Sequence, residues 1–172
     1  ALAGFSIILA GCQNNDENEQ HYDNKLFISA SNFTKEILFK AGDTNVETGL
    51  SVAIAKPEEH DIKVTMSPAP ELLSTYKLAY YDETAVLLSE EHYSMPETST
   101  TIKSGSIVSP ELPIEFINTG ELDIKTTYVL PVTIKSVEGI GVLQSAKTYY
   151  YVFRGASLIN VVCNCLLYTS PS

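Results

Sequence analysis

The sequence has no tryptophan, only three cysteines and three histidines, and few basic residues, with 11 Lys and Arg against 21 Asp and Glu. A formal net charge of -10 repels phosphate backbones, because nucleic-acid affinity depends on Lys and Arg that neutralise phosphates. We therefore expect no nucleic-acid partner. So few Cys and His leave little material for a metal site or a redox centre, and we expect neither a metal nor another cofactor. With 172 residues, of which 44% are hydrophobic and 19% charged, the chain has the composition of one folded domain.

The first ten residues are nearly all apolar, and this run stops at Gly11-Cys12. It is too short to span a bilayer, which needs about 20 apolar residues, but it suits the apolar part of a secretory signal. The tetrapeptide Leu9-Ala10-Gly11-Cys12 resembles the lipobox of bacterial lipoproteins, in which the Cys is acylated and becomes the mature N-terminus. Residues 1–12 are thus predicted to be a truncated lipoprotein signal, with Cys12 as the lipidation site. The alternative is a buried N-terminal strand that ends at an ordinary Cys.

Residues 13–24 form a polar, acidic tract without a single Lys or Arg. A segment of low hydrophobicity and one charge sign cannot bury enough surface to fold, which predicts a flexible tether. Asp16 and Glu17 stand where a short acidic tract, similar to the surface-export signal of Bacteroidetes lipoproteins, follows the acylated Cys. We expect the protein to be held by its lipid at the cell surface, on the outer membrane. The membrane is then one predicted partner.

Residues 163–172 begin with Cys163 and Cys165, a pair that cannot complete a tetrahedral metal site on its own. A disulfide between two residues this close in the chain has poor geometry. The string from Cys165 onward resembles translated sequencing-adapter read-through, so a non-native tail is predicted here. The alternative is a genuine linker into a further domain.

Between these ends, apolar and polar residues alternate with a period of two, which is typical of half-buried strands. In the clearest run, 61–66, the residues Ile62, Val64 and Met66 share one face. Ala30 is likewise expected on the buried face of its own run. Pro131 cannot donate to a ladder, so it is predicted to mark an edge strand or a bulge. Turn residues separate the runs, and the pattern predicts a two-sheet β-sandwich over residues 25–162. The other predicted strands lie near 26–30, 33–40, 50–54, 112–116, 127–136 and 144–153, the last two as a hairpin.

One segment, residues 70–79, breaks this pattern. Its apolar residues, among them Leu72, Leu73 and Tyr76, recur at helical spacing. Pro70 suits the first helical position, and Glu71 suits the positive end of the helix dipole. We expect one short inserted helix whose apolar face caps an end of the sandwich.

These elements carry a family resemblance that covers residues 25–162. The chain resembles a Bacteroidetes family of N-terminal lipoprotein domains of unknown function, similar to the N-terminal domain of some endo-β-N-acetylglucosaminidases. The resemblance implies an all-β fold, an immunoglobulin-like β-sandwich, and supplies no catalytic residues. Two positions depart from the family pattern, because Lys77 stands where Asn is usual after Tyr76 and Leu88 stands where Pro is usual. The matching segments are Ile62–Thr65, Pro70–Tyr76, Leu87–Tyr93, Thr101–Gly105, Thr127–Ile134 and Tyr149–Phe153.

No catalytic constellation emerges from the sequence. The clusters at 58–61 and 90–92 combine Glu, His and Asp, but neighbours on a strand point to opposite faces, which favours solvated loops over a metal site. There is no Gly-x-Ser-x-Gly turn and no Gly-rich phosphate loop. We therefore predict that the domain is not an enzyme.

Tyrosine, with ten residues, is the one enriched residue type that could contact a ligand. Tyr80, Tyr81, Tyr93 and Tyr150 are the candidate glycan contacts, because a tyrosine offers a flat face for a sugar ring and a hydroxyl for hydrogen bonds. Tyr150 is expected to point outward, since Tyr149 and Tyr151 share the opposite, core-facing side of their strand. The alternative is that all of these tyrosines only pack in the sandwich.

The leading functional hypothesis is a non-catalytic N-terminal module of a cell-surface lipoprotein, a spacer or accessory domain in glycan capture. Glycans would then be partners through a downstream domain. The alternatives are a structural adhesin or pilus-like subunit, and a weak carbohydrate-binding module.

Overall fold

The computed structural model describes residues 23–156. The predicted lipidation site Cys12, the signal, nearly all of the acidic tether and the tail from residue 163 lie outside these residues. Within residues 23–156, no helix is both long enough and apolar enough to cross a membrane. The strands are β1 Lys25–Ile28, β2 Thr34–Phe39, β3 Val46–Leu50, β4 Val52–Ala53, β5 Ile62–Pro68, β6 Val86–Leu87, β7 Tyr93–Ser94, β8 Ser99–Ile102, β9 Leu112–Phe116, β10 Tyr128–Val137, β11 Gly141–Val142 and β12 Thr148–Gly155; the α-helix is α1 Leu73–Tyr80.

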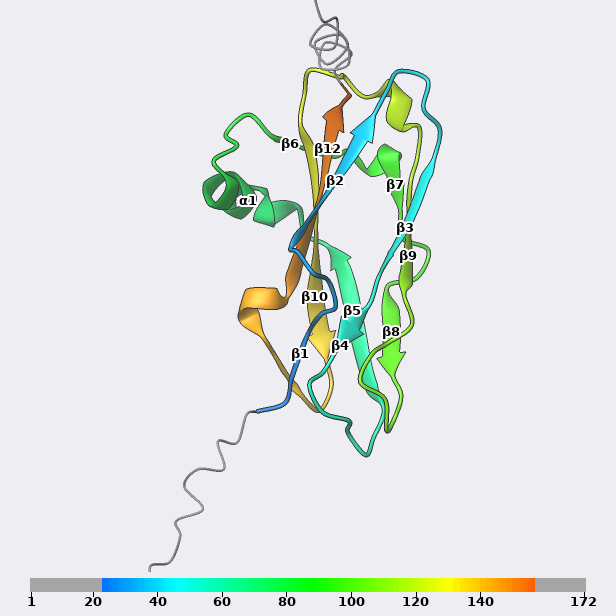
Figure 1. Ribbon diagram of the computed structural model, residues 1–172, viewed down its shortest axis with the longest axis vertical. Helices are drawn as coiled ribbons and strands as arrows, with labels where there is room; N and C mark the ends of the chain where they lie inside the picture. Colours follow the sequence, from blue (N-terminus) through cyan, green and yellow to red (C-terminus); the bar gives the residue numbers. More distant parts are fainter. Residues whose placement is uncertain (1–22, 157–172) are drawn as a thin grey trace, which may run out of the picture.

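The strands form two facing layers (Figure 1). One layer has the order β2-β12-β10-β5-β8, with β6 beside β10. The other consists of two three-stranded parts, β11-β1-β4 and β3-β9-β7, in which β3 and β4 follow each other almost without interruption. β1 pairs with β4 in one layer, while the hairpin of β10 and β12 lies in the opposite layer. This is the order of an immunoglobulin-like sandwich, and the predicted fold class is confirmed.

On each side of the sandwich one segment of the chain changes layers. β1 pairs with β4 in one layer, the chain bends at 31–33, and β2 then pairs with β12 in the other. In the same way β7 pairs with β9, and after Pro96 the strand β8 pairs with β5. β7 has two residues and β8 has four, so this side of the sandwich presents no long unpaired strand. The first switch also explains why β1 ends at Ile28 and why Ala30, expected on the same buried face, is exposed.

The main core lies between the layers and matches the predicted alternation closely. Ile62, Val64 and Met66 of β5 are fully buried, and Lys63 between them is exposed. On β12 the core-facing residues are Tyr151 and Phe153, with Tyr149 beside them, as predicted. The predicted hairpin is also confirmed, because β10 and β12 pair antiparallel from Tyr128–Phe153 to Thr133–Thr148.

The prediction for Pro131 is wrong. It lies on β10, a central strand with β12 on one side and β5 on the other, and the register shift of β10 falls further on, between Ile134 and Ser136. Opposite Pro131, the Tyr150 N–H donates away from β10, to the Phe33 carbonyl at 2.9 Å. Pro131 and Tyr150 therefore form a non-hydrogen-bonded pair, in which β12 accepts no hydrogen bond from residue 131. The missing N–H of Pro131 costs no hydrogen bond with β12. On the other side the ladder of β5 ends at Pro68, opposite Val132, one residue before Pro131 is reached.

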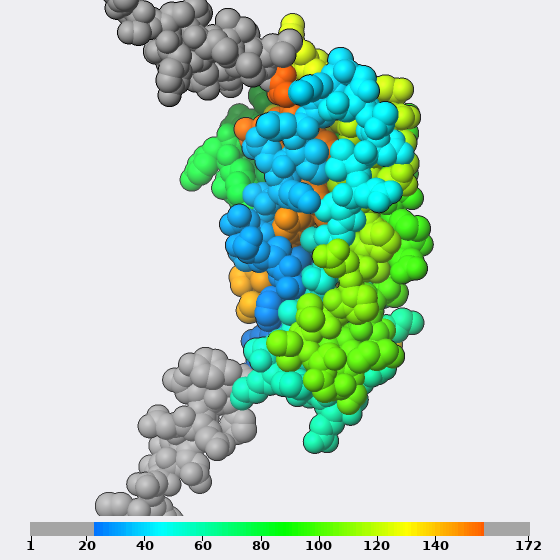
Figure 2. All heavy atoms as spheres, turned by 45° about the vertical axis from the view of Figure 1, so that its right-hand side comes forward, coloured from blue at the N-terminus to red at the C-terminus, as the bar shows by residue number. Residues whose placement is uncertain are grey.

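The helix is also placed differently from the prediction. α1 does not cap an end of the sandwich; it packs on the outer face of the layer that contains β10 and β12 (Figure 1). In the space-filling view, the green atoms around α1 project from the side of the body (Figure 2). The reason is that β10 and β12 carry apolar side chains on their outer face as well as their inner one, and the helix covers them.

Candidate functional site

The start of α1 is tied to the central strand β10. The 3₁₀ turn Pro70–Leu72 leads into the helix, with Pro70 in its first position, as the sequence predicts. The Ala69 N–H before it donates to the Pro131 carbonyl at 2.9 Å. Tyr76 of α1 is buried, with Leu73 half-buried one turn earlier, so this side of the helix faces the sheet. The helix thereby forms one wall of a site whose floor is the sheet.

The end of α1 holds a tyrosine in an unfavourable backbone conformation. The helix ends at Tyr80, and Tyr81 takes the left-handed conformation with φ of 54°. The Asp82 N–H then donates to the Lys77 carbonyl at 3.2 Å, which closes the helix in the manner of a Schellman motif. Glycine or asparagine usually fills this position, because a bulky side chain is strained there. The closing turn turns Asp82 back toward the sheet.

Three tyrosine rings meet between α1 and β12. Tyr76 stacks on Tyr80 with ring centroids 4.9 Å apart and planes at 29°, and it lies 5.3 Å from Tyr150. Tyr80 approaches Tyr150 edge-on at 6.0 Å. Tyr76 and Tyr150 belong to a second hydrophobic cluster, separate from the main core, that consists of Tyr76, Ala85, Val129, Tyr150 and Val152. Such offset and edge-on contacts stabilise aromatic pairs beyond the area they bury.

Beside these rings lies a pocket of about 240 Å³ between α1, β2 and β12. We call it the helix–sheet pocket. One wall is aromatic, from α1, and the opposite side is polar, from the outward positions of two strands that pair in parallel. Two other hollows of comparable size, next to β9 and near Asn24, have no aromatic residue among the described residues that line them. The lining of the helix–sheet pocket is Thr34, Glu36, Tyr76, Tyr80, Val152 and Arg154.

The charges at the pocket are close together but loosely paired. Arg154 Nη2 lies 3.6 Å from Asp82 Oδ2, and Arg154 Nε lies 3.9 Å from Glu36 Oε2. Both distances exceed that of a good hydrogen bond, so guanidinium donors remain for a further acceptor. Burial raises the pKa of Tyr76, and the Asp82 carboxylate acts in the same direction, whereas Arg154 beside the hydroxyl opposes it. The phenol is thus neutral at ordinary pH and can donate or accept a hydrogen bond.

The structure separates the predicted glycan contacts. Tyr80 lines the pocket and is 43% exposed. Tyr150 does point away from the main core, but the expectation that it is exposed is wrong, since α1 covers it and leaves 7% of it accessible. Tyr81 is 94% exposed but does not line the pocket. Tyr93 lies on β7 in the other layer and packs against the main core, where burial raises its pKa.

Sequence reasoning missed the charged part of the site. Glu36 and Arg154 lie on different strands, and only the parallel pairing of β2 with β12 brings them together. The helical spacing places Tyr76 on the packed face of the helix, which is correct, but it does not indicate the pocket beside this residue. A usable signal did exist: consecutive apolar residues on β10 and β12, rather than alternating ones, indicate strands buried on both faces.

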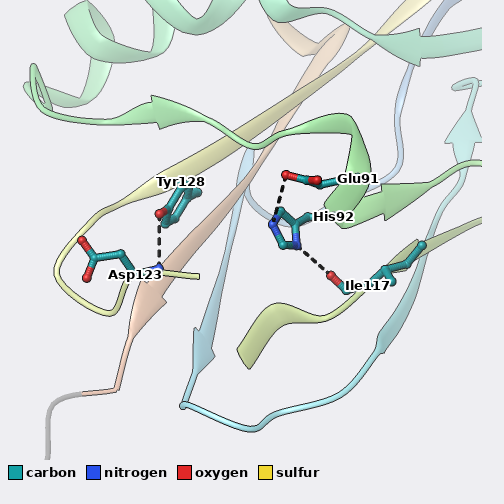
Figure 3. A network of polar contacts seen from close by, with 5 residues as sticks. All are labelled: Glu91, His92, Ile117, Asp123 and Tyr128. Atoms are coloured by element: carbon teal, nitrogen blue, oxygen red, sulfur yellow. Dashed lines mark hydrogen bonds and ion pairs between the residues drawn. The ribbon is translucent and has the colours of Figure 1, made fainter. Parts of the chain in front are cut away.

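The clusters that combine His with acidic residues serve the fold. His92 Nδ1 lies 3.1 Å from the Ile117 carbonyl, with Glu91 3.8 Å from its Nε2 (Figure 3), and this contact joins the segment before β7 to the end of β9. Asp61 accepts hydrogen bonds from Lys103 at 2.8 Å and from the Ser104 N–H at 2.9 Å, and both lower its pKa. Among residues 23–156, no three His, Cys, Asp or Glu side chains are grouped so that they could hold a metal ion.

The fold and the site together define a small immunoglobulin-like module with a pocket on the outer face of one layer. A family model described as an N-terminal domain matches residues 22–141, well over half of the chain. The chain belongs to this family of N-terminal domains, and the resemblance to the Bacteroidetes family is confirmed. No curated protein matches the sequence significantly.

Solved structures from Bacteroides share the fold. A protein of Bacteroides ovatus provisionally described as carbohydrate binding aligns with TM-score 0.67 and 18% identity, over 76% of this chain and 36% of its own. Bacteroides thetaiotamicron EndoBT-3987, solved with a Man5GlcNAc product, aligns with TM-score 0.63 and 19% identity, over 76% and 30%. A two-domain protein of unknown function from Bacteroides fragilis aligns with TM-score 0.60 and 14% identity, over 78% and 46%. At these identities the likeness shows the fold alone, and this chain spans less than half of each structure.

Proposed function

We propose that the chain is a non-catalytic N-terminal module of a cell-surface lipoprotein, which acts as a spacer or accessory domain in glycan capture. The observation that carries this proposal is the direction of the chain through the sandwich. β1 begins near one end of the long axis and β12 ends at the other (Figure 1). In such a module, the part of the protein after β12 is separated from the part before β1 by the full length of the domain.

The comparisons support a place within a longer protein. The family is one of N-terminal domains, and the chain covers 30% to 46% of the three solved structures described above. The descriptions of two of these structures mention carbohydrate. One is called a carbohydrate-binding protein, and the other is a complex with a glycan product. We therefore place glycan recognition or cleavage mainly in the part that follows, with this module between it and the membrane.

The partner at the other end is the outer membrane. Acylation of Cys12 would place more than one acyl chain at a single residue, which gives stable anchoring where one chain gives only marginal binding. The acidic residues 13–24 would then act as the tether from the lipid to β1.

The anchor is tested with Cys12→Ala in the natural full-length protein. We expect the variant to remain unprocessed, to lose labelling by a palmitate analogue and to leave the lipid-anchored fraction. Asn14→Ala, two residues away, serves as the matched control and should be labelled like the wild type. Undiminished labelling of the Cys12 variant would disprove the assignment.

The spacer role is tested by replacing residues 23–156 in the full-length protein. One variant deletes them, and a second substitutes an unrelated immunoglobulin-like domain whose ends also lie at opposite poles. Binding of fluorescent high-mannose glycan and of plant mannan to whole cells is then measured. We expect the deletion to lower binding and the substitution to restore most of it. Full binding by the deletion variant would contradict the proposal.

A further inference from the structure

The helix–sheet pocket combines an open aromatic face with hydrogen-bonding groups of both kinds. Tyr80 rests on Tyr76 through one side of its ring, while a large part of the ring stays exposed at the pocket. Arg154 offers N–H donors, and Glu36 with Asp82 offers carboxylate acceptors, at distances that leave neither fully satisfied. Thr34 adds a hydroxyl that can donate and accept.

A pyranose ring matches these features. Its C–H groups form an apolar face that packs on an aromatic ring, and its adjacent hydroxyls can donate to a carboxylate while they accept from a guanidinium. The volume of about 240 Å³ lies just below the range of pockets for drug-sized ligands, so one sugar unit is the ligand size that it suits.

The charges decide which class of sugar fits. The Arg154 guanidinium lies beside two carboxylates, that of Glu36 in the pocket lining and that of Asp82 outside the lining. The charged groups at the pocket therefore have an excess of negative charge. A uronate or another acidic sugar would be repelled at this short range, whereas a neutral sugar is not. We infer that the helix–sheet pocket, within the glycan-capturing role on which this inference rests, binds a single neutral sugar unit weakly, with Tyr80 as the stacking platform.

The test is a titration of the whole 172-residue chain, monitored through its amide signals in ¹H–¹⁵N NMR spectra. The probes are the methyl glycosides of glucose, galactose, mannose and N-acetylglucosamine, set against the uronates that match glucose and galactose. We expect at least one neutral glycoside to shift the amide signals of Tyr80, Val152 and Arg154, with a Kd of about 1 mM or weaker. Its matched uronate should bind roughly fivefold less tightly.

Three variants sharpen the result. Tyr80→Ala removes the platform and should weaken binding roughly tenfold or more. Glu36→Gln keeps the shape of an exposed edge-strand side chain, so the fold is retained. The variant should bind the neutral sugar more weakly. The difference in Kd between the neutral sugar and its matched uronate should become smaller. Tyr81→Ala changes a neighbouring exposed tyrosine that does not line the pocket and should leave the titration unchanged.

Several outcomes would overturn the inference: no shift at the pocket with any neutral sugar, equal binding of the uronates, or binding that survives Tyr80→Ala. Each of them leaves the spacer role intact, because that role is measured separately by the domain replacement on cells. Conversely, sugar binding at the pocket together with full glycan capture by the deletion variant would refute the spacer role and retain the pocket.

Discussion

The two faces of the layer that contains β10 and β12 differ sharply. Its inner face joins the main core, where Leu130, Val132 and Phe153 are fully buried among side chains from both layers. Its outer face carries only the small cluster around Tyr76 and Tyr150, covered by a helix of eight residues. The inner face therefore dominates the free energy of folding, while the outer face is covered incompletely and leaves room for a pocket. Because side chains alternate along a strand, the residues of β10 and β12 that stabilise the fold point inward, and those that support the pocket point outward.

The largest expected effect comes from the main core. Phe116 of β9 is fully buried and contacts Tyr151 and Phe153 with ring centroids 5.0 and 4.6 Å apart. Phe116→Ala should lower the free energy of unfolding by roughly 3 to 5 kcal/mol, because it leaves a cavity between two layers that cannot close. Urea denaturation measures this. A loss below about 1 kcal/mol, the scale of an ordinary surface change, would show that the inner face is not the dominant core.

A smaller loss is expected on the outer face. Tyr76→Ala should lower the free energy of unfolding by about 2 kcal/mol, because the small cluster borders an open pocket and its neighbours can relax. Hydrogen exchange should show protection lost in α1 but kept in β10 and β12, as local opening of a thinly packed element. If the strands lost protection together with the helix, the two clusters would act as one unit and the comparison would fail.

A third substitution should increase stability. The Tyr151 hydroxyl is buried and has no hydrogen-bond partner among the described residues, although Thr48 lies close enough to affect its pKa. Tyr151→Phe removes an unsatisfied polar group without changing the ring, so we expect a gain of about 1 kcal/mol. Tyr149→Phe, on the same face, is the matched control. A loss of stability would mean that the Tyr151 hydroxyl has a partner in solution.

The same residue predicts how stability changes with pH. Burial raises the pKa of Tyr151 far above the ordinary value of 10.0, and it raises that of Tyr149 and Tyr150 as well. Below pH 10 both folded and unfolded states hold these protons; above it the unfolded state loses them first. Stability is therefore present below pH 10 and is lost as pH rises. The thermal midpoint should fall as the pH rises above about 10, and less steeply for Tyr151→Phe.

The smallest expected effect is at the end of α1. Tyr81→Asn should raise the free energy of unfolding by about 0.5 kcal/mol, because asparagine tolerates the left-handed conformation better than tyrosine. Asn118 offers the comparison, since it is the other non-glycine residue between 23 and 156 with positive φ. Asn118→Tyr should lower the free energy of unfolding by a similar amount. Thermal denaturation of both variants measures the difference, and a destabilised Tyr81→Asn would indicate that Tyr81 makes contacts that outweigh its strain.

Much of the main core could be predicted from the residues alone. Alternation placed Ile62, Val64 and Met66 inward because the period of a strand is two, whatever the strand pairs with. The turn glycines at 42, 105 and 139 all take positive φ, as their turn chemistry suggests. Pro131 and Ala30 were misjudged, because their surroundings depend on where a neighbouring strand stops or changes layers.

The sequence by itself determined which side chains face the interior, since alternation and turn residues are local properties of the chain. Only the tertiary structure decided what lies outside the sheet. The burial of Tyr150 depends on where α1 docks, and the meeting of Glu36 with Arg154 depends on the parallel pairing of β2 with β12. These contacts join residues more than 70 positions apart in the chain, and no local pattern encodes which distant partner a strand or helix will take.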